Sequence, residues 1–138
     1  MLVRDRMTTN VVTVSSYDTL ATAASRMKAA GLRRLPVVDE RELVGIISAY
    51  DLRNWPDGLT LIAVRAAMTR NPVTVSSTDS LEHAVSVAHK RQVGGLPVVD
   101  HGRLVGMIVA RDLFIAEPRA IPEWDPSRKG AGLRARIR

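Results

Sequence analysis

Runs of apolar residues along this chain predict the same series of strands and helices twice. Three runs of strand length occur in each copy, at residues 11–14, 35–39 and 43–47 and again at 72–75, 96–100 and 104–109. Between the first two strands, apolar side chains recur at the i, i+3, i+4, i+7 spacing of a helix face, as Leu20, Ala23, Ala24, Met27 and as Leu81, Ala84, Val85, Ala88. A last helix is predicted over 49–55 and 110–116. Each copy therefore reads as strand, helix, strand, strand, helix.

Local signals predict where these elements begin and end. Asp18 and Asp79 follow Ser-Ser pairs and suit helix N-caps, and Glu82 lies three residues after Asp79, as in a capping box. Gly31 is predicted to end the first long helix. Residues 55–58, Trp-Pro-Asp-Gly, form a predicted turn between the copies.

The two copies align without gaps. Residues 3–55 match residues 64–116 at a constant shift of 61 positions, with 26 identities in 53 pairs. Such a repeat indicates two copies of one supersecondary unit, packed about a pseudo-twofold axis with their sheets meeting at a shared seam. We expect a mixed α/β fold with one repeat over 1–58, a second over 59–117, and a basic, irregular tail over 118–138.

The amino-acid composition indicates the cellular compartment and excludes some kinds of catalysis. The chain has 138 residues, no cysteine and only 4% aromatic residues, so its core must be aliphatic and disulfides or thiol catalysis are excluded. Residues 1–7 do not resemble a signal peptide, and no apolar run approaches the ~20 residues that span a bilayer. We expect a cytoplasmic protein without membrane contact.

The net charge of +6 belongs mainly to the tail. Residues 127–138 contain five basic and no acidic side chains, whereas the other 126 residues contain 15 basic and 14 acidic ones. This tail is either a solvated end or an arm for nucleic acid, and we favour the first interpretation.

Motifs for catalysis or metal binding are missing from the sequence. His83, His89 and His101 form no HExxH or HxH pattern, and no GxSxG, P-loop or GxGxxG motif occurs. We therefore predict that the chain is not an enzyme, has no metal site and needs no obligatory cofactor.

Both copies contain LPVVD, then LVG with further apolar residues, and the first continues with Ser-Ala-Tyr-Asp-Leu at 48–52. This ordered set, present twice, resembles the CBS (cystathionine β-synthase) domain family, as a tandem pair (Bateman module) of the small standalone bacterial type. The resemblance implies two β-α-β-β-α repeats, and dimerisation into a four-repeat disc. It also implies sensing of adenosine-containing ligands, including energy sensing, and regulation of an unknown partner protein in trans.

The family's ribose–phosphate signature is intact in the first copy, from Gly45 to Asp51. The resemblance implies that Ser48, Asp51, Arg34 and Arg33 hold ribose and phosphate. It implies an apolar and adenine-facing wall made by Ile46, Ile47, Met68, Asn71, Val73, Val93, Gly94 and Gly95. Taken alone, Ser48 and Asp51 could simply cap a helix, the two arginines could be solvated charges, and Gly94-Gly95 could be a turn.

The second copy departs from the signature, because Val109 replaces the hydroxyl residue. A weaker second site is expected at Asp112, Arg111, Asn10, Val12 and Leu32. We predict asymmetric occupancy, dominated by the Ser48 and Asp51 site, with AMP, ADP, ATP or S-adenosylmethionine as regulatory ligand. The alternatives are a nucleic-acid-associated protein that uses its tail, or a purely structural dimer without a nucleotide.

Overall fold

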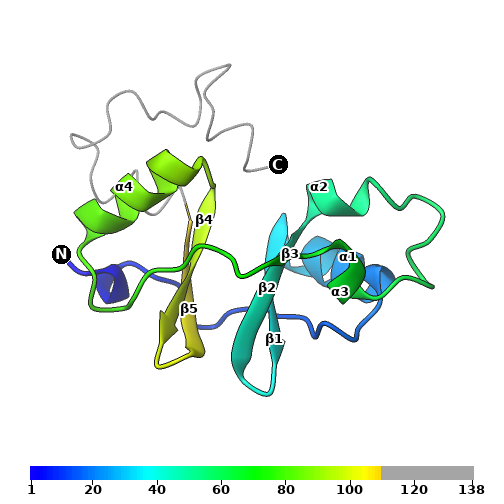
Figure 1. Ribbon diagram of the computed structural model, residues 1–138, viewed down its shortest axis with the longest axis horizontal. Helices are drawn as coiled ribbons and strands as arrows, with labels where there is room; N and C mark the ends of the chain where they lie inside the picture. Colours follow the sequence, from blue (N-terminus) through cyan, green and yellow to red (C-terminus); the bar gives the residue numbers. More distant parts are fainter. Residues whose placement is uncertain (110–138) are drawn as a thin grey trace. The chain divides into compact units, whose positions relative to one another are not determined.

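The structure is a computed structural model that describes residues 1–109 (Figure 1). The described residues form two compact units of mixed α/β fold. We call residues 12–72 the first-repeat unit, and residues 1–11 together with 73–109 the second-repeat unit. Within residues 1–109, no helix has both the length and the apolar character needed to cross a membrane.

The first-repeat unit contains α1 (Leu20–Ala30), β1 (Arg34–Asp39), β2 (Glu42–Ser48), α2 (Ala49–Leu52), α3 (Val64–Ala67) and β3 (Thr69–Arg70). The second-repeat unit contains the 3-10 helix η1 (Val3–Asp5), α4 (Leu81–Arg91), β4 (Gly95–Asp100) and β5 (Arg103–Val109).

Each unit is built on one antiparallel hairpin. β1 pairs with β2 so that Leu35 lies opposite Ile47, and β4 pairs with β5 so that Leu96 lies opposite Ile108. The four side chains are fully buried. The hairpins predicted from the apolar runs are therefore confirmed, with equivalent register in both units.

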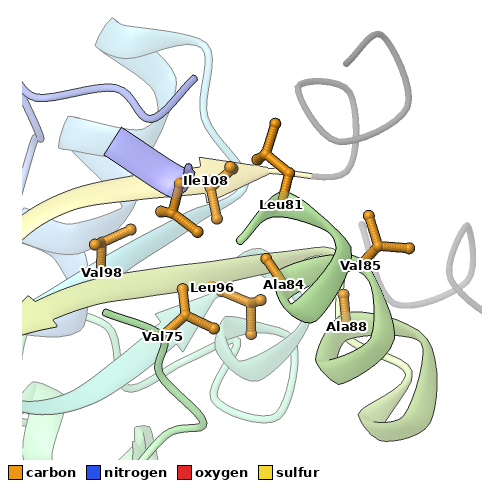
Figure 2. Close-up of a cluster of buried hydrophobic side chains, with 9 residues drawn as sticks. Val75, Leu81, Ala84, Val85, Ala88, Leu96, Val98 and Ile108 are labelled. Atoms are coloured by element: carbon orange, nitrogen blue, oxygen red, sulfur yellow. The ribbon is translucent and has the colours of Figure 1, made fainter. Parts of the chain in front are cut away.

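The long helices bury the predicted apolar faces against these hairpins. Leu20, Ala23 and Met27 of α1 enter one core, and Leu81, Ala84, Val85 and Ala88 of α4 enter the other. Figure 2 shows these α4 side chains together with Leu96, Val98 and Ile108 of the hairpin, which belong to the same core cluster. Gly31 ends α1 in a left-handed conformation, with φ of 67°, as predicted.

The helix N-caps differ from the prediction. Thr19 caps α1 by accepting a hydrogen bond from Thr22 N, and Ser80 caps α4 by accepting one from His83 N. Asp18 and Asp79 each lie one residue before the cap, and their carboxylates accept hydrogen bonds from Ser15 N and Ser76 N, respectively. The capping box expected at Asp79 and Glu82 is therefore wrong.

Two further expectations need correction. The runs at 11–14 and 72–75 are not strands; each makes a single parallel bridge, Val14 to Val37 and Val75 to Val98. The helix predicted over 49–55 ends at Leu52, and a turn follows it in which Trp55 N donates to Leu52 O. The turn at 55–58 is present, since Gly58 N donates to Trp55 O. The helix predicted over 110–116 and the tail lie outside the described residues.

One edge of each hairpin is covered by the segment that precedes the other hairpin in the sequence. Residues 1–8 lie on the second-repeat unit, where Val3 is fully buried and Thr8 exchanges two backbone hydrogen bonds with Met107 (Figure 1). Residues 64–71, which correspond to residues 3–10 of the first copy, lie on the first-repeat unit, where β3 pairs with β2. We call residues 1–8 and 64–71 the covering segments.

Candidate functional site

Ser48 and Asp51 form a capping box where β2 passes into α2. Asp51 N donates to Ser48 Oγ at 3.1 Å, and Ser48 N donates to Asp51 Oδ2 at 2.9 Å. The alternative view of these residues as helix caps is thus confirmed, and it does not exclude a binding role. Within residues 1–109, Oδ1 of Asp51 has no hydrogen-bond partner, so it remains available to a hydroxyl group.

Arg33 and Arg34 lie beside this capping box. Arg34 is opposite Ser48 in the β1–β2 register, and Arg33 O accepts a hydrogen bond of 2.8 Å from Ala49 N. Arg33 is exposed and Arg34 is half-buried. Burial, and secondly the charge of Arg33, lower the pKa of the Arg34 guanidinium.

The predicted apolar wall lies only partly on the first-repeat unit, which holds Ser48 and Asp51. Ile46 is half-buried, whereas Ile47 is fully buried in the core, because successive side chains of a strand point to opposite faces. Met68 is half-buried, and Asn71 is exposed with a left-handed φ of 49°. The structure therefore places Ile46, Met68 and Asn71 on the unit that holds Ser48 and Asp51, while Ile47 serves the core.

The remaining predicted residues are divided between the units. The second-repeat unit contains Val73, Val93, Gly94 and Gly95; Gly94 is buried just before β4, and Gly95 is buried as its first residue. For the weaker site, Asn10 belongs to this unit, and Val12 and Leu32 belong to the first-repeat unit. Asp112 and Arg111 lie outside the described residues.

One feature of the site was missed in the sequence. Gly45 is buried beneath the covering segment 64–71, close to Met68 and Thr69. The only signal in the sequence is that both copies contain Met-Thr in the covering segment and Gly in the strand. These matching residues do not show by themselves that the methionine and threonine pack on the glycine; that contact is seen only in the fold.

No metal centre is built from the described part of the chain. Among residues 1–109, no group of three or more His, Asp or Glu side chains is placed to hold a metal ion. His83 is half exposed and lies 3.9 Å from Asp79 on the surface of the second-repeat unit.

Comparison with known proteins identifies the family. The CBS domain model matches the chain twice, over residues 3–58 and 64–118. This chain belongs to the CBS domain family. The two matches correspond to the two sequence repeats, so it contains a tandem CBS pair.

Relatives of this CBS pair include small proteins and parts of large enzymes. A CBS domain-containing protein of Dictyostelium discoideum is 35% identical over 129 residues, which cover 83% of this chain and 89% of that protein. Inosine-5'-monophosphate dehydrogenase of Korarchaeum cryptofilum is 34% identical over 128 residues, but these cover 90% of this chain and only 26% of the enzyme. The similarity to the enzyme is confined to its CBS region and assigns no catalysis to the CBS pair.

Solved CBS pairs have the same fold. CBSX2, a protein of Arabidopsis thaliana, in complex with AMP has a TM-score of 0.78 and 28% identity, covering 86% of this chain and 96% of that one. The CBS domain pair of protein MJ0100, in complex with 5'-methylthioadenosine and S-adenosyl-L-methionine, has a TM-score of 0.77 and 28% identity, with the same coverage of 86% and 96%. Both solved relatives thus hold adenosine-containing ligands.

Proposed function

We propose that this CBS pair is a non-catalytic regulatory module that binds an adenine nucleotide at Ser48 and Asp51. The observation that carries the proposal is the geometry of Asp51. One carboxylate oxygen is fixed by Ser48 N, and the other has no partner within residues 1–109. The adenosine ligands of the solved relatives support the same chemistry.

Asp51 is suited to a ribose hydroxyl because its side chain is already oriented. The capping box holds the carboxylate in place through one hydrogen bond, which Ser48 N donates to Oδ2 at 2.9 Å, while Asp51 N donates to Ser48 Oγ at 3.1 Å. A ligand hydroxyl can then donate to Oδ1 without the entropic cost of ordering this side chain. Arg33 and Arg34 supply positive charge next to the same strand end, where they would contact the phosphate.

The second copy of the signature offers less to such a ligand. Val109 has no hydroxyl group, and Gly94 and Gly95 stand where the first copy has Arg33 and Arg34. We therefore propose asymmetric occupancy in favour of the Ser48 site. The contribution of Val73, Val93, Gly94 and Gly95 to the base wall stays a prediction.

Regulation would follow from unequal affinity of the ligand for two arrangements of the protein. We propose that two copies of the chain pair and that a partner protein acts in trans. Sedimentation with and without AMP tests the first part: a single monomeric species in both conditions would contradict it.

The binding proposal is tested by thermal shift and calorimetry with AMP, ADP, ATP and S-adenosylmethionine. A ligand at 100 times its Kd stabilises the folded state by about 2.7 kcal/mol. Asp51→Asn keeps the size of the side chain and its capacity to accept from Ser48 N, but it removes the carboxylate charge. We expect at least a tenfold loss of AMP affinity, about 1.4 kcal/mol.

The matched control is Thr19→Ala, which removes the N-cap of α1 in the same unit without touching Ser48 or Asp51. We expect it to lower stability by about 1 kcal/mol and to leave AMP affinity unchanged. Absence of a shift with all four ligands in the folded wild-type protein would overturn the proposed function.

A further inference from the structure

Methionine carries all the sulfur in this chain, which has five methionines and no cysteine. The structure separates the five by exposure. Met27 and Met107 are buried, at 4% and 7% exposure, whereas Met1 is 64% exposed. Met7 and Met68 are half-buried, so solvent reaches part of each side chain. These two methionines are also the ones that the covering segments place against the hairpins.

Both half-buried methionines lie directly over a glycine of a hairpin strand. A Cβ atom added to Gly45 would be 2.7 Å from Met68 Sδ. A Cβ atom added to Gly106 would likewise be 2.7 Å from Met7 Sδ. Real Cβ atoms essentially never come within 3.0 Å of another atom, so neither contact leaves room for an additional heavy atom between sulfur and glycine. Met7 and Met68 also pack against the two hydrophobic cores, so each contacts a glycine and an apolar core at once.

Oxidation by a peroxide would change this contact in size and in polarity. The thioether sulfur attacks one oxygen of hydrogen peroxide, the O–O bond breaks, and methionine sulfoxide and water form. The sulfur is oxidised and the peroxide is reduced. The added oxygen is a hydrogen-bond acceptor that does not fit above the glycine, and burying it among apolar side chains without a donor costs free energy. We therefore expect the side chain to turn outward, which places the oxygen in water and draws the sulfur away from the glycine.

The backbone pairing of each covering segment lies next to its methionine in the sequence. Thr69, the residue after Met68, begins β3, which pairs with β2. Thr8, the residue after Met7, donates to Met107 O at 2.8 Å and accepts from Met107 N at 2.9 Å. A displaced methionine therefore disturbs the hydrogen bonds of the residue that follows it.

We propose that Met7 and Met68 are oxidation sites, and that their conversion to methionine sulfoxide loosens the covering segments from the hairpins. The modification acts on packing, so it does not depend on nucleotide binding. It is reversible, because methionine sulfoxide reductases restore the thioether. Leucine has a similar volume and no sulfur, so Met7→Leu and Met68→Leu keep an apolar contact that a peroxide does not change.

The test treats wild type and the double variant Met7→Leu/Met68→Leu with hydrogen peroxide. Peptide mass spectrometry measures the extent of oxidation at each methionine. In wild type, Met7 and Met68 should oxidise after the exposed Met1 and before the two buried methionines, because the peroxide must reach the sulfur.

Thermal unfolding and hydrogen exchange measure the effect of the modification. Once both sulfoxides have formed in wild type, we expect the Tm to fall by about 5 °C. Hydrogen exchange at Thr8 N and in β3 should become about tenfold faster. The double variant should keep its Tm and its protection in peroxide, and a methionine sulfoxide reductase should restore both in oxidised wild type.

Three results would each overturn the proposal. Oxidation of Met7 and Met68 no faster than that of the buried methionines would show that peroxide does not reach them. An unchanged Tm and unchanged exchange with both sulfoxides formed would show that the contact accepts the oxygen. An equal loss of Tm in the double variant would assign the effect to other residues.

Single variants apply if the double variant does not fold. In oxidised Met68→Leu, exchange should become faster at Thr8 N and stay unchanged in β3. In oxidised Met7→Leu, the two segments should exchange their behaviour. Loss of protection in both covering segments of both variants would contradict a local effect of each methionine and overturn the proposal.

Discussion

Replacing Asp39 with asparagine changes a carboxylate that holds a loop to a hairpin. Asp39, at the end of β1, accepts hydrogen bonds from Ser15 Oγ at 2.9 Å, from Ser16 N at 3.0 Å and from Ser16 Oγ. Asp100 repeats the arrangement at the end of β4, with Ser76 and Ser77 as donors.

The expected loss of stability follows from these contacts. Hydrogen bonds to charged groups contribute about 1.5–3 kcal/mol and neutral ones about 0.5–1.5 kcal/mol. Ser16 is only 5% exposed, but the carboxylate of Asp39 is partly solvated. This solvation reduces the difference in free energy between hydrogen bonds to a charged and to a neutral acceptor. We expect Asp39→Asn to lower the free energy of unfolding by about 1–2 kcal/mol. Asp39→Asn/Asp100→Asn should lower it by about 2–4 kcal/mol, because the two sites share no residue.

The pH dependence has a defined sign. Burial alone would raise the pKa of Asp39, but the hydrogen bonds from the Ser16 side chain, Ser16 N and Ser15 together lower it. For Asp100, the hydrogen bond from the Ser77 side chain is the largest cause of a lowered pKa, followed by that from Ser77 N. A lowered folded-state pKa stabilises the protein above the unfolded value of about 3.9, and this stabilisation is lost as the pH falls through the folded value.

The assay is urea unfolding of wild type and the double variant at several pH values between 6 and 3. The difference in unfolding free energy should be full at pH 6 and should shrink below about pH 4, because the asparagines do not titrate. A difference that is constant from pH 6 to pH 3 would refute the role of the two carboxylates. A difference near zero at pH 6 would refute the stability argument itself.

Two further predictions concern the covering segment and a helix end. Val3→Ala removes part of a fully buried side chain, so we expect a loss of about 2 kcal/mol, and hydrogen exchange should show reduced protection in β4 and β5. If protection falls in β1 and β2 instead, the assignment of residues 1–8 to the second-repeat unit is wrong. Gly31→Ala should cost about 1 kcal/mol in thermal unfolding, because Gly31 has φ of 67° with no atom within 4 Å of the added methyl group. An unchanged or higher Tm would contradict a purely conformational cost.

Periodicity predicted the hairpins and the buried helix faces because it reflects burial directly. It failed for the runs at 11–14 and 72–75, where β-branched residues suggested strands. Val14 N donates to Pro36 O and Val38 N donates to Val14 O, which makes one parallel bridge. The next bond toward Val12 would need an N–H at Pro36, and proline has none. Pro97 has the same effect in the second copy.

The capping role of Ser48 and Asp51 was recognisable from their spacing, but its detailed geometry was not. A carboxylate three residues after a serine can cap a helix or bind a ribose, and both uses need the same orientation. Only the hydrogen bonds show that Oδ2 is engaged and that Oδ1 has no partner among residues 1–109. The burial of Ile47 follows from the alternation of side chains along a strand. The sequence shows that Ile46 and Ile47 face opposite sides, but only the fold shows which side is buried.

The pairing of covering segments with hairpins could not be derived from the repeat, because its two copies are too similar. Both segments contain Met-Thr, and both hairpins contain the glycine that admits it. Connectivity decides the pairing for residues 64–71. The preceding residues are bound to the first turn of α1, because Leu20 N donates to Ile62 O and Ala21 N donates to Leu59 O. These bonds hold the chain on the first-repeat unit before it reaches β2, which leaves the equivalent edge of β5 to residues 1–8.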